Sequence, residues 1–153
     1  IVPGELNFQE VEVLDFDKNA LGGKAIRKQV NLIFKKGKKS LIMTLLIYLP
    51  NKKTKSPVFL AYNFEGNHSV NNDPSIIIYG SKENELTNEK HEEIKENKRG
   101  GRESRWALNK IIDSGYGLAT IDYNNVDPDK NDFSDGIHSL LYKFGQILSL
   151  IHI

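Results

Sequence analysis

The residues best suited to chemistry follow a short apolar run, residues 58–62, in the first half of the chain. Amide, aromatic, glycine and imidazole positions come directly after it: Asn63, Phe64, Gly66, Asn67 and His68. Ligands bind at the carboxyl ends of strands in open α/β sheets, so this spacing predicts the wall of a substrate pocket. The alternative is that Asn67 and His68 hydrogen-bond within the loop and only stabilise it.

A serine esterase needs a nucleophile that is exposed on a Gly-x-Ser-x-Gly-like turn between a strand and a helix. Residues 66–70 come nearest to this pattern, but they lack the second small residue, so we expect Ser69 to be structural. The chain contains no other such turn. We therefore expect no catalytic residue in this chain and no ester hydrolysis by it as given.

Two further positions have a chemical and a structural interpretation. Asp127 and Asp129 lie in an acidic loop, yet its spacing is not that of a calcium-binding EF-hand, and we predict no metal site. Trp106 could stack on a sugar ring. Its helical spacing with Leu108 and Ile112 instead favours a place in the core.

Composition excludes several function classes. Lys and Arg total 21 against 20 Asp and Glu, so no global field favours nucleic acid or an anionic membrane. The longest apolar stretch, residues 41–49, is too short to span a bilayer. The lysine-rich segment 35–39, with glycine at its centre, is typical of a solvated hairpin turn. We predict no nucleic-acid partner, no membrane partner and no cofactor, and the sequence gives no oligomeric state.

The first half of the chain predicts antiparallel strands. Apolar residues alternate over 11–16 and 26–34, so one side of these strands is expected to be solvated. A denser apolar run follows over 40–49. The uninterrupted run 58–62 is typical of a strand that is buried on both faces.

The second half predicts parallel βα units. The charged stretch 84–102 is expected to be a surface insertion, followed by a helix that Ser104 caps and that ends before Gly115. A strand over 117–123, an acidic loop over 124–135 and a helix from about Gly136 come next. The predicted fold class is α/β, with antiparallel N-terminal strands leading into a mixed, mostly parallel sheet with flanking helices.

Several blocks, in this order along the chain, resemble one enzyme family. They are Pro57 to His68, Arg105-Trp106, Gly115 to Thr120, Asp127-Pro128-Asp129 and Gly136-Ile137-His138. Together they are similar to the bacterial glucuronoyl esterases, 4-O-methyl-glucuronoyl methylesterase-like carbohydrate esterases of the α/β-hydrolase superfamily. The resemblance gives Arg105, Trp106, Asp127 and Asp129 no fixed role.

The resemblance implies a serine carboxylic ester hydrolase that acts on glucuronic acid esters of plant cell-wall polysaccharide, either lignin–carbohydrate or methyl glucuronate esters. Such an enzyme needs no cofactor and is secreted or periplasmic. Its serine, acid and histidine are expected downstream of this sequence. Two alternatives are an acetylxylan-type carbohydrate esterase and a non-catalytic, β-rich carbohydrate-binding module.

The resemblance also divides the chain. Residues 1–147 are expected to be the N-terminal portion of one truncated α/β-hydrolase domain. Residues 148–153, Leu-Ser-Leu-Ile-His-Ile, match the translation of a transposon-end sequencing adapter. The alternative for these six residues is an ordinary apolar helix end.

Overall fold

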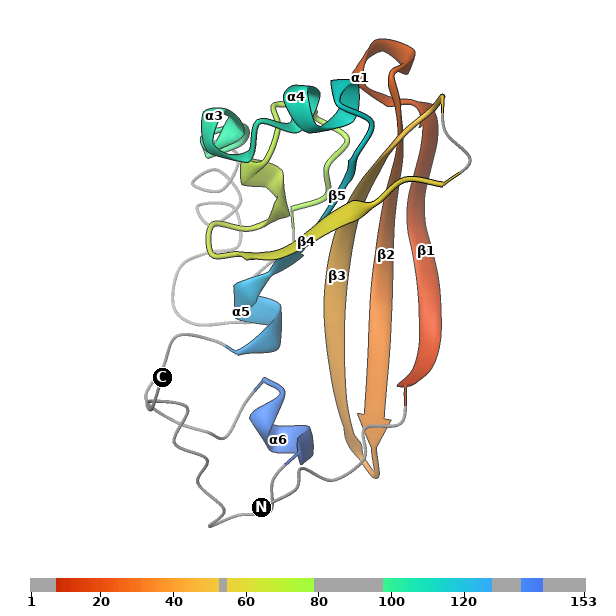
Figure 1. Ribbon diagram of the computed structural model, residues 1–153. Coiled ribbons are helices and arrows are strands. Elements are labelled where there is room, and N and C mark those ends of the chain that lie inside the picture. The colour runs from red at the N-terminus through yellow and green to blue at the C-terminus, as the bar shows by residue number, and fades with distance from the viewer. Residues whose placement is uncertain (1–7, 53–54, 79–97, 128–135, 142–153) are drawn as a thin grey trace.

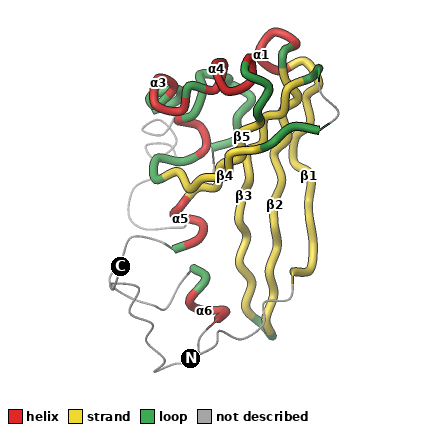
Figure 2. The backbone as a smooth tube through the Cα atoms, in the orientation of Figure 1, coloured by secondary structure: helices red, strands yellow, loops and turns green. Residues whose placement is uncertain are grey.

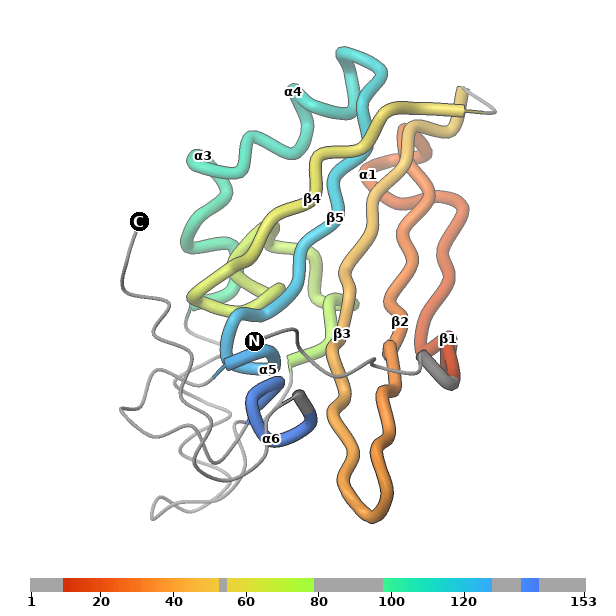
Figure 3. Tube along the Cα trace, turned by 60° about the horizontal axis from the view of Figure 1, so that its bottom comes forward, coloured from red at the N-terminus to blue at the C-terminus, as the bar shows by residue number. Residues whose placement is uncertain are grey.

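The computed structural model describes residues 8–52, 55–78, 98–127 and 136–141. Within these ranges five strands form a mixed sheet in the order β1-β2-β3-β5-β4, which Figure 3 follows across the molecule. Of the strands in the described ranges, only β4 and β5 are parallel to each other; the other neighbours are antiparallel. The predicted mixed sheet is confirmed. The strands are β1 (Phe8–Asn19), β2 (Ala25–Lys36), β3 (Lys39–Pro50), β4 (Val58–Asn63) and β5 (Gly117–Asp122).

Three long strands, β1 to β3, make up one side of the sheet (Figure 1). A turn labelled α1 (Ala20–Gly23) joins β1 to β2, and its Leu21 and Gly22 have positive φ. The predicted lysine-rich hairpin joins β2 to β3, with Lys36 opposite Lys39. Gly37 has a φ of 62°, a conformation that glycine adopts without steric cost.

The helices are all short (Figure 2). The prediction of a single helix after Ser104 is wrong, because Ala107, with a φ of 47°, divides the helical segment in two. The first part begins after Arg102 without a side-chain cap, so Ser104 lies inside it. Part of the expected loop 124–135 is helical too. The elements are η1 (Asn67–Ser69), α3 (Glu103–Trp106), α4 (Leu108–Asp113), α5 (Tyr123–Val126) and α6 (His138–Leu141).

The sheet has an apolar cluster on each face. On one face, Leu108 and Ile112 of α4 pack with Tyr48 of β3 and Leu118 of β5. Trp106 is half-buried against this cluster, in agreement with the core position predicted for it. On the other face a smaller cluster joins Met43, Ile121 and Val126. No helix of the described ranges is long and apolar enough to cross a membrane.

The polar side of β2 was expected to face solvent, and this expectation is wrong. Arg27, Gln29 and Asn31 are 4%, 1% and 6% exposed. The segment after η1 contacts Arg27 and Gln29, and side chains of β1 meet all three residues from the neighbouring strand. Gln29, for example, donates to the Ser75 carbonyl, and its own oxygen accepts from the Ile77 amide. These polar groups are buried because each has a partner.

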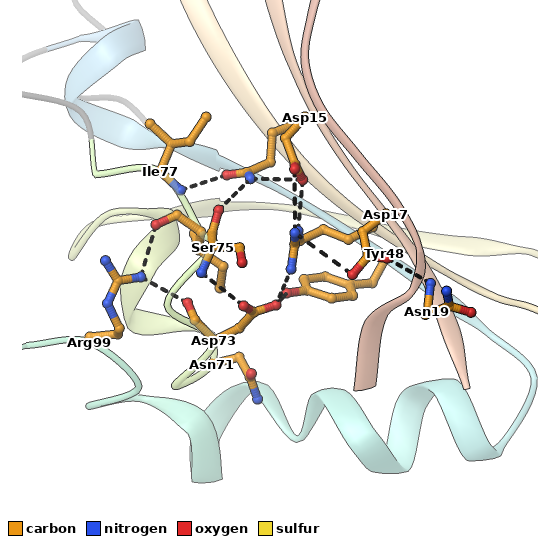
Figure 4. Close-up of polar contacts among 12 residues, drawn as sticks. Asp15, Asp17, Asn19, Tyr48, Asn71, Asp73, Ser75, Ile77 and Arg99 are labelled. Atoms are coloured by element: carbon orange, nitrogen blue, oxygen red, sulfur yellow. Dashed lines mark hydrogen bonds and ion pairs between the residues drawn. The ribbon is translucent and has the colours of Figure 1, made fainter. Parts of the chain in front are cut away.

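Arg27 is the centre of this buried network, and Figure 4 shows its partners Asp15 and Asp73 together with Tyr48. Its Nε donates to Asp15 Oδ2 at 2.8 Å, and its Nη1 pairs with the Asp73 carboxylate. The Tyr48 hydroxyl also donates to Asp73, at 3.1 Å. Burial, followed by the negative charge of Asp73, raises the pKa of Tyr48, so its hydroxyl keeps the proton that it donates. Arg27 of β2 and Tyr48 of β3 thus hold one loop residue, Asp73, while Asp15 of β1 holds Arg27.

The strand predicted to be buried on both faces is instead an exposed edge strand, so this prediction is wrong for the chain as described. Within the described ranges β5 is the only strand paired with β4, and α4 packs on β3 and β5 rather than on β4. Both faces of β4 expose side chains within the part of the chain that the structure describes. Its exposed side chains are Val58 (43%), Phe59 (54%), Leu60 (68%) and Tyr62 (57%).

We predict that Arg27→Met lowers the free energy of unfolding by roughly 3 kcal/mol, because Asp15 and Asp73 then lose a buried cation. Lys24→Met is the matched control, since Lys24 pairs with Asp113 at an exposed site. Its cost should stay below about 1 kcal/mol. Urea unfolding followed by circular dichroism measures both, and equal losses would contradict the central place of Arg27.

Stability should also depend on pH through Asp15. The hydrogen bond from Arg27 holds the pKa of this carboxyl below its ordinary value of 3.8, although burial opposes the shift. A lowered pKa in the folded state stabilises the protein above that ordinary value, and the stabilisation is lost as the pH falls through the folded-state pKa. We expect Asp15→Asn to flatten the acid limb of a plot of unfolding free energy against pH. An acid limb that Asp15→Asn leaves unchanged would contradict this role of the Arg27 hydrogen bond.

Candidate functional site

The loop after β4 is organised from inside by Asn63. Its Nδ2 donates to the Gly66 carbonyl at 2.8 Å and to Ser69 Oγ at 3.1 Å, while its Oδ1 accepts from the Glu65 amide. Ser69 Oγ in turn donates to the Gly66 carbonyl. Asn63 therefore closes the turn, and Ser69 is held as a structural hydroxyl.

Asn67 joins this loop to two strands of the sheet. Its Nδ2 donates to the Thr44 carbonyl of β3 at 3.0 Å, and its Oδ1 accepts from Thr120 Oγ1 of β5 at 2.9 Å. The side chain is 6% exposed and uses both of its polar ends inside the protein. This geometry supports a structural role for Asn67, the alternative that the sequence left open.

His68 is buried as well, and its backbone connects the loop to the segment before α3. The Gly100 amide donates to the His68 carbonyl at 3.0 Å, and the Arg102 amide donates to the Ser69 carbonyl at 2.9 Å. Arg99 fastens the same segment to the carbonyls of Asp73 and Ile76. The Arg27 network thus fixes both chain segments around the candidate wall.

Phe64, by contrast, is on the outside of the loop and is 68% exposed. Its ring stacks on Tyr123 at a centroid distance of 4.4 Å, and Tyr62 meets Tyr123 edge to face at 6.2 Å. Asn124 Nδ2 donates to the Phe64 carbonyl. These aromatic rings gather at the carboxyl ends of two parallel strands, where ligands bind in open α/β sheets.

Glu65 is the second outward side chain of the loop. Its Oε1 accepts from Arg102 Nε at 2.7 Å and also pairs with Nη2 of the same side chain. The Arg102 hydrogen bond, with smaller contributions from Lys98 and Arg105, lowers the pKa of Glu65. The carboxylate thus stays ionised, and the rim of the loop carries both charges of an ion pair.

Sequence reasoning missed Asp122, which faces this loop from the end of β5. Asp122 is the register partner of Asn63 across the parallel pair, and its Oδ1 caps α5 by accepting from the Asn124 amide at 3.0 Å. A Cβ placed at Gly66 would meet Asp122 Oδ2 at 3.2 Å. The rule that identified Asn63, a polar residue directly after an apolar strand, also applies to Asp122.

Within the described ranges, the loop contains no assembled catalytic centre. Ser69 donates to a carbonyl rather than to an imidazole. His138 Nε2 lies 3.3 Å from Asp127 Oδ2, a contact that ties α6 to the end of α5. Among the described residues, no group of three or more His, Asp or Glu side chains is placed to hold a metal ion.

The chain is similar in sequence and in structure to known esterases. No family model matches the chain. A carbohydrate esterase named MZ0003, from an unknown prokaryotic organism, is 40% identical over 95% of the chain and 35% of its own length. The solved glucuronoyl esterase from Solibacter usitatus is 38% identical with a TM-score of 0.73, and a promiscuous CE15 esterase from a marine bacterial metagenome is 38% identical with a TM-score of 0.68. Each structural match covers 97% of this chain and 37% of the other.

The chain matches an N-terminal portion of the CE15 glucuronoyl esterases. Its sheet is accordingly part of an α/β-hydrolase fold. The chain spans about a third of the length of these relatives. The family resemblance inferred from the ordered blocks of sequence is confirmed.

The other positions of the glucuronoyl esterase blocks lie outside the loop after β4. Arg105 and Trp106 belong to α3, next to the Arg102 rim. Asp127 contacts His138, whereas Asp129 lies outside the described residues, as do residues 148–153. Most of the expected insertion 84–102 is also outside them. Of the five wall residues, the structure places Asn63, Gly66, Asn67 and His68 inside the loop and Phe64 on its surface.

Gly66 tests the packing of this esterase-like loop. Its φ is 80°, and an added Cβ would lie 2.8 Å from His68 Cε1. We predict that Gly66→Ala destabilises the protein by about 1–2 kcal/mol for the backbone conformation alone, with a further loss from the clash. Gly37→Ala is the control, because Gly37 has a similar φ of 62° and open space around it. Thermal unfolding compares the two variants; an equal effect would mean that the loop yields to the methyl group.

Proposed function

We propose that this chain is part of a serine carboxylic ester hydrolase that acts on glucuronic acid esters of plant cell-wall polysaccharide. The observation that carries the proposal is the match, over nearly the whole chain, to glucuronoyl and carbohydrate esterases at 38–40% identity. The chain itself contributes a loop beside the site and no nucleophile, so we expect it to be inert alone. We also propose that the parent protein works outside the cytoplasm, where polysaccharide is found.

The outward side chains of the loop support a sugar ring as the acyl group. In a glucuronate ester the ring belongs to the acyl side, so the wall next to the nucleophile must accommodate hydroxyl groups and an apolar ring face. Phe64 offers an aromatic surface, and the Glu65–Arg102 pair offers hydrogen-bonding groups beside it. A site for a bare acetyl group needs neither.

The test uses the full-length protein that contains this chain. We predict a higher kcat/KM for a benzyl glucuronate than for an acetylated xylooligosaccharide, and no turnover of either by the 153-residue chain alone. Faster deacetylation would favour an acetylxylan-type esterase. Binding of polysaccharide without any hydrolysis would favour a carbohydrate-binding module.

A second variant tests the wall within the same full-length protein. Phe64→Ala should lower kcat/KM for the glucuronate by about tenfold, because one aromatic contact with the ring is lost. Phe16→Ala is the control, since Phe16 is also exposed but belongs to β1, at the far side of the sheet. If both variants have the same kinetics as the wild type, Phe64 does not contact the substrate.

A further inference from the structure

The backbone of the turn that precedes α3 is held against the end of η1. The Gly100 amide donates to the His68 carbonyl at 3.0 Å, and the Arg102 amide donates to the Ser69 carbonyl at 2.9 Å. Gly100 has a φ of 66°, and a Cβ at this position would lie 2.9 Å from Asn72 Cβ. The turn and the loop region are thus in direct contact, so a rotation of the turn displaces the loop.

The Arg99 side chain makes a second attachment of this turn, and it ends on a different segment. Its Nη1 donates to the Asp73 and Ile76 carbonyls, both at 2.9 Å (Figure 4). These carbonyls belong to one short turn, because the Ile76 amide donates to the Asp73 carbonyl at 3.1 Å. The Asp73 carboxylate in turn binds Arg27 of β2. Arg99 therefore joins the turn before α3 to a segment that the sheet holds in place.

Two separate attachments fix the direction of the turn as well as its position. With the backbone hydrogen bonds alone, the turn could pivot about them; the Arg99 contacts prevent this rotation. The side chain that depends on the direction of the turn is Arg102, which is 49% exposed and pairs with Glu65 of the loop. Arg99 reaches inward and Arg102 reaches outward, so one cation sets the place of the other.

We propose that Arg99 is a positioning residue of the esterase: it fixes the turn so that Arg102, paired with Glu65, keeps a defined place for the hydroxyl groups of the substrate's sugar ring. The choice of ligand rests on the proposed function. The placement of Arg102 by Arg99 rests only on the contacts within this chain, so the two can fail separately.

Kinetics of the full-length protein test the role in binding. Arg99→Met should raise KM for a benzyl glucuronate about fivefold and leave kcat nearly unchanged, because a hydrogen bond to the ring is lost equally in the ground state and the transition state. Arg99→Lys should restore most of the wild-type KM, since an ammonium group can also donate to both carbonyls. Once Arg102→Gln has removed the contact with the ring, Arg99→Met should raise KM little further.

Gly37→Ala is the control for a loss of stability without a change at the site. It strains the turn of the β2–β3 hairpin, where Gly37 has a φ of 62° and open space around it. Its KM should equal that of the wild type. An unchanged KM in Arg99→Met, an equal rise in Gly37→Ala, or additive effects of Arg99→Met and Arg102→Gln would each overturn the proposal.

The titration of Glu65 in the full-length protein tests the placement without using activity. The Arg102 hydrogen bond holds the pKa of Glu65 below its ordinary value of 4.5. Arg99→Met should raise this pKa toward its ordinary value, and Gly37→Ala should not; NMR of isotope-labelled glutamate side chains measures both. An unchanged pKa in Arg99→Met would overturn the placement. A raised pKa in a protein that hydrolyses no glucuronate ester would uphold the placement and overturn the proposed function.

Discussion

The ion pair between Arg27 and Asp73 is the interaction on which the arrangement of the candidate site depends. A guanidinium in the middle of a sheet face is costly to bury, and here carboxylates from β1 and from the loop after η1 offset that cost. The same loop residue receives the Tyr48 hydroxyl and, through its carbonyl, Arg99. Asp73 thus adds an anchor on β2 and β3 to the one that Asn67 makes on β3 and β5, and its carbonyl also holds Arg99 of the segment before α3.

The loop divides its residues between support and contact. The side chains of Asn63 and Asn67 form their hydrogen bonds with carbonyls and hydroxyls of the protein itself, and these bonds fix the backbone between the two residues. Phe64 and Glu65, which lie between them, are therefore presented outward on a rigid turn. The internal stabilisation that the sequence left open as an alternative thus describes Asn63 and Asn67, whereas the pocket wall stays a prediction that rests on the outward residues.

The sequence predicted the elements whose causes are local. Alternation over 26–34 located β2, the glycine at position 37 located the hairpin, and the βα pattern predicted the parallel β4–β5 pair. The predictions failed where a residue far away in the sequence decides whether a side chain is buried. The polar side of β2 is buried because Asp73, 46 residues away, pairs with Arg27. The exposure of β4 likewise depends on which elements lie next to it, and the residue pattern within the strand does not predict those neighbours.

The sequence separation of these contacts also sets an order of folding. Strands β1 to β3 are joined by short turns, so their pairing closes small loops and is fast. The contact of Arg27 with Asp73 closes a much longer loop. Arg27 can pair with Asp15 as well as Asp73 only after β1 and β2 are aligned. We therefore expect the segment after β4 to acquire its structure after the N-terminal meander has formed. The candidate loop should then be the part of this region that loosens first when the meander is disturbed.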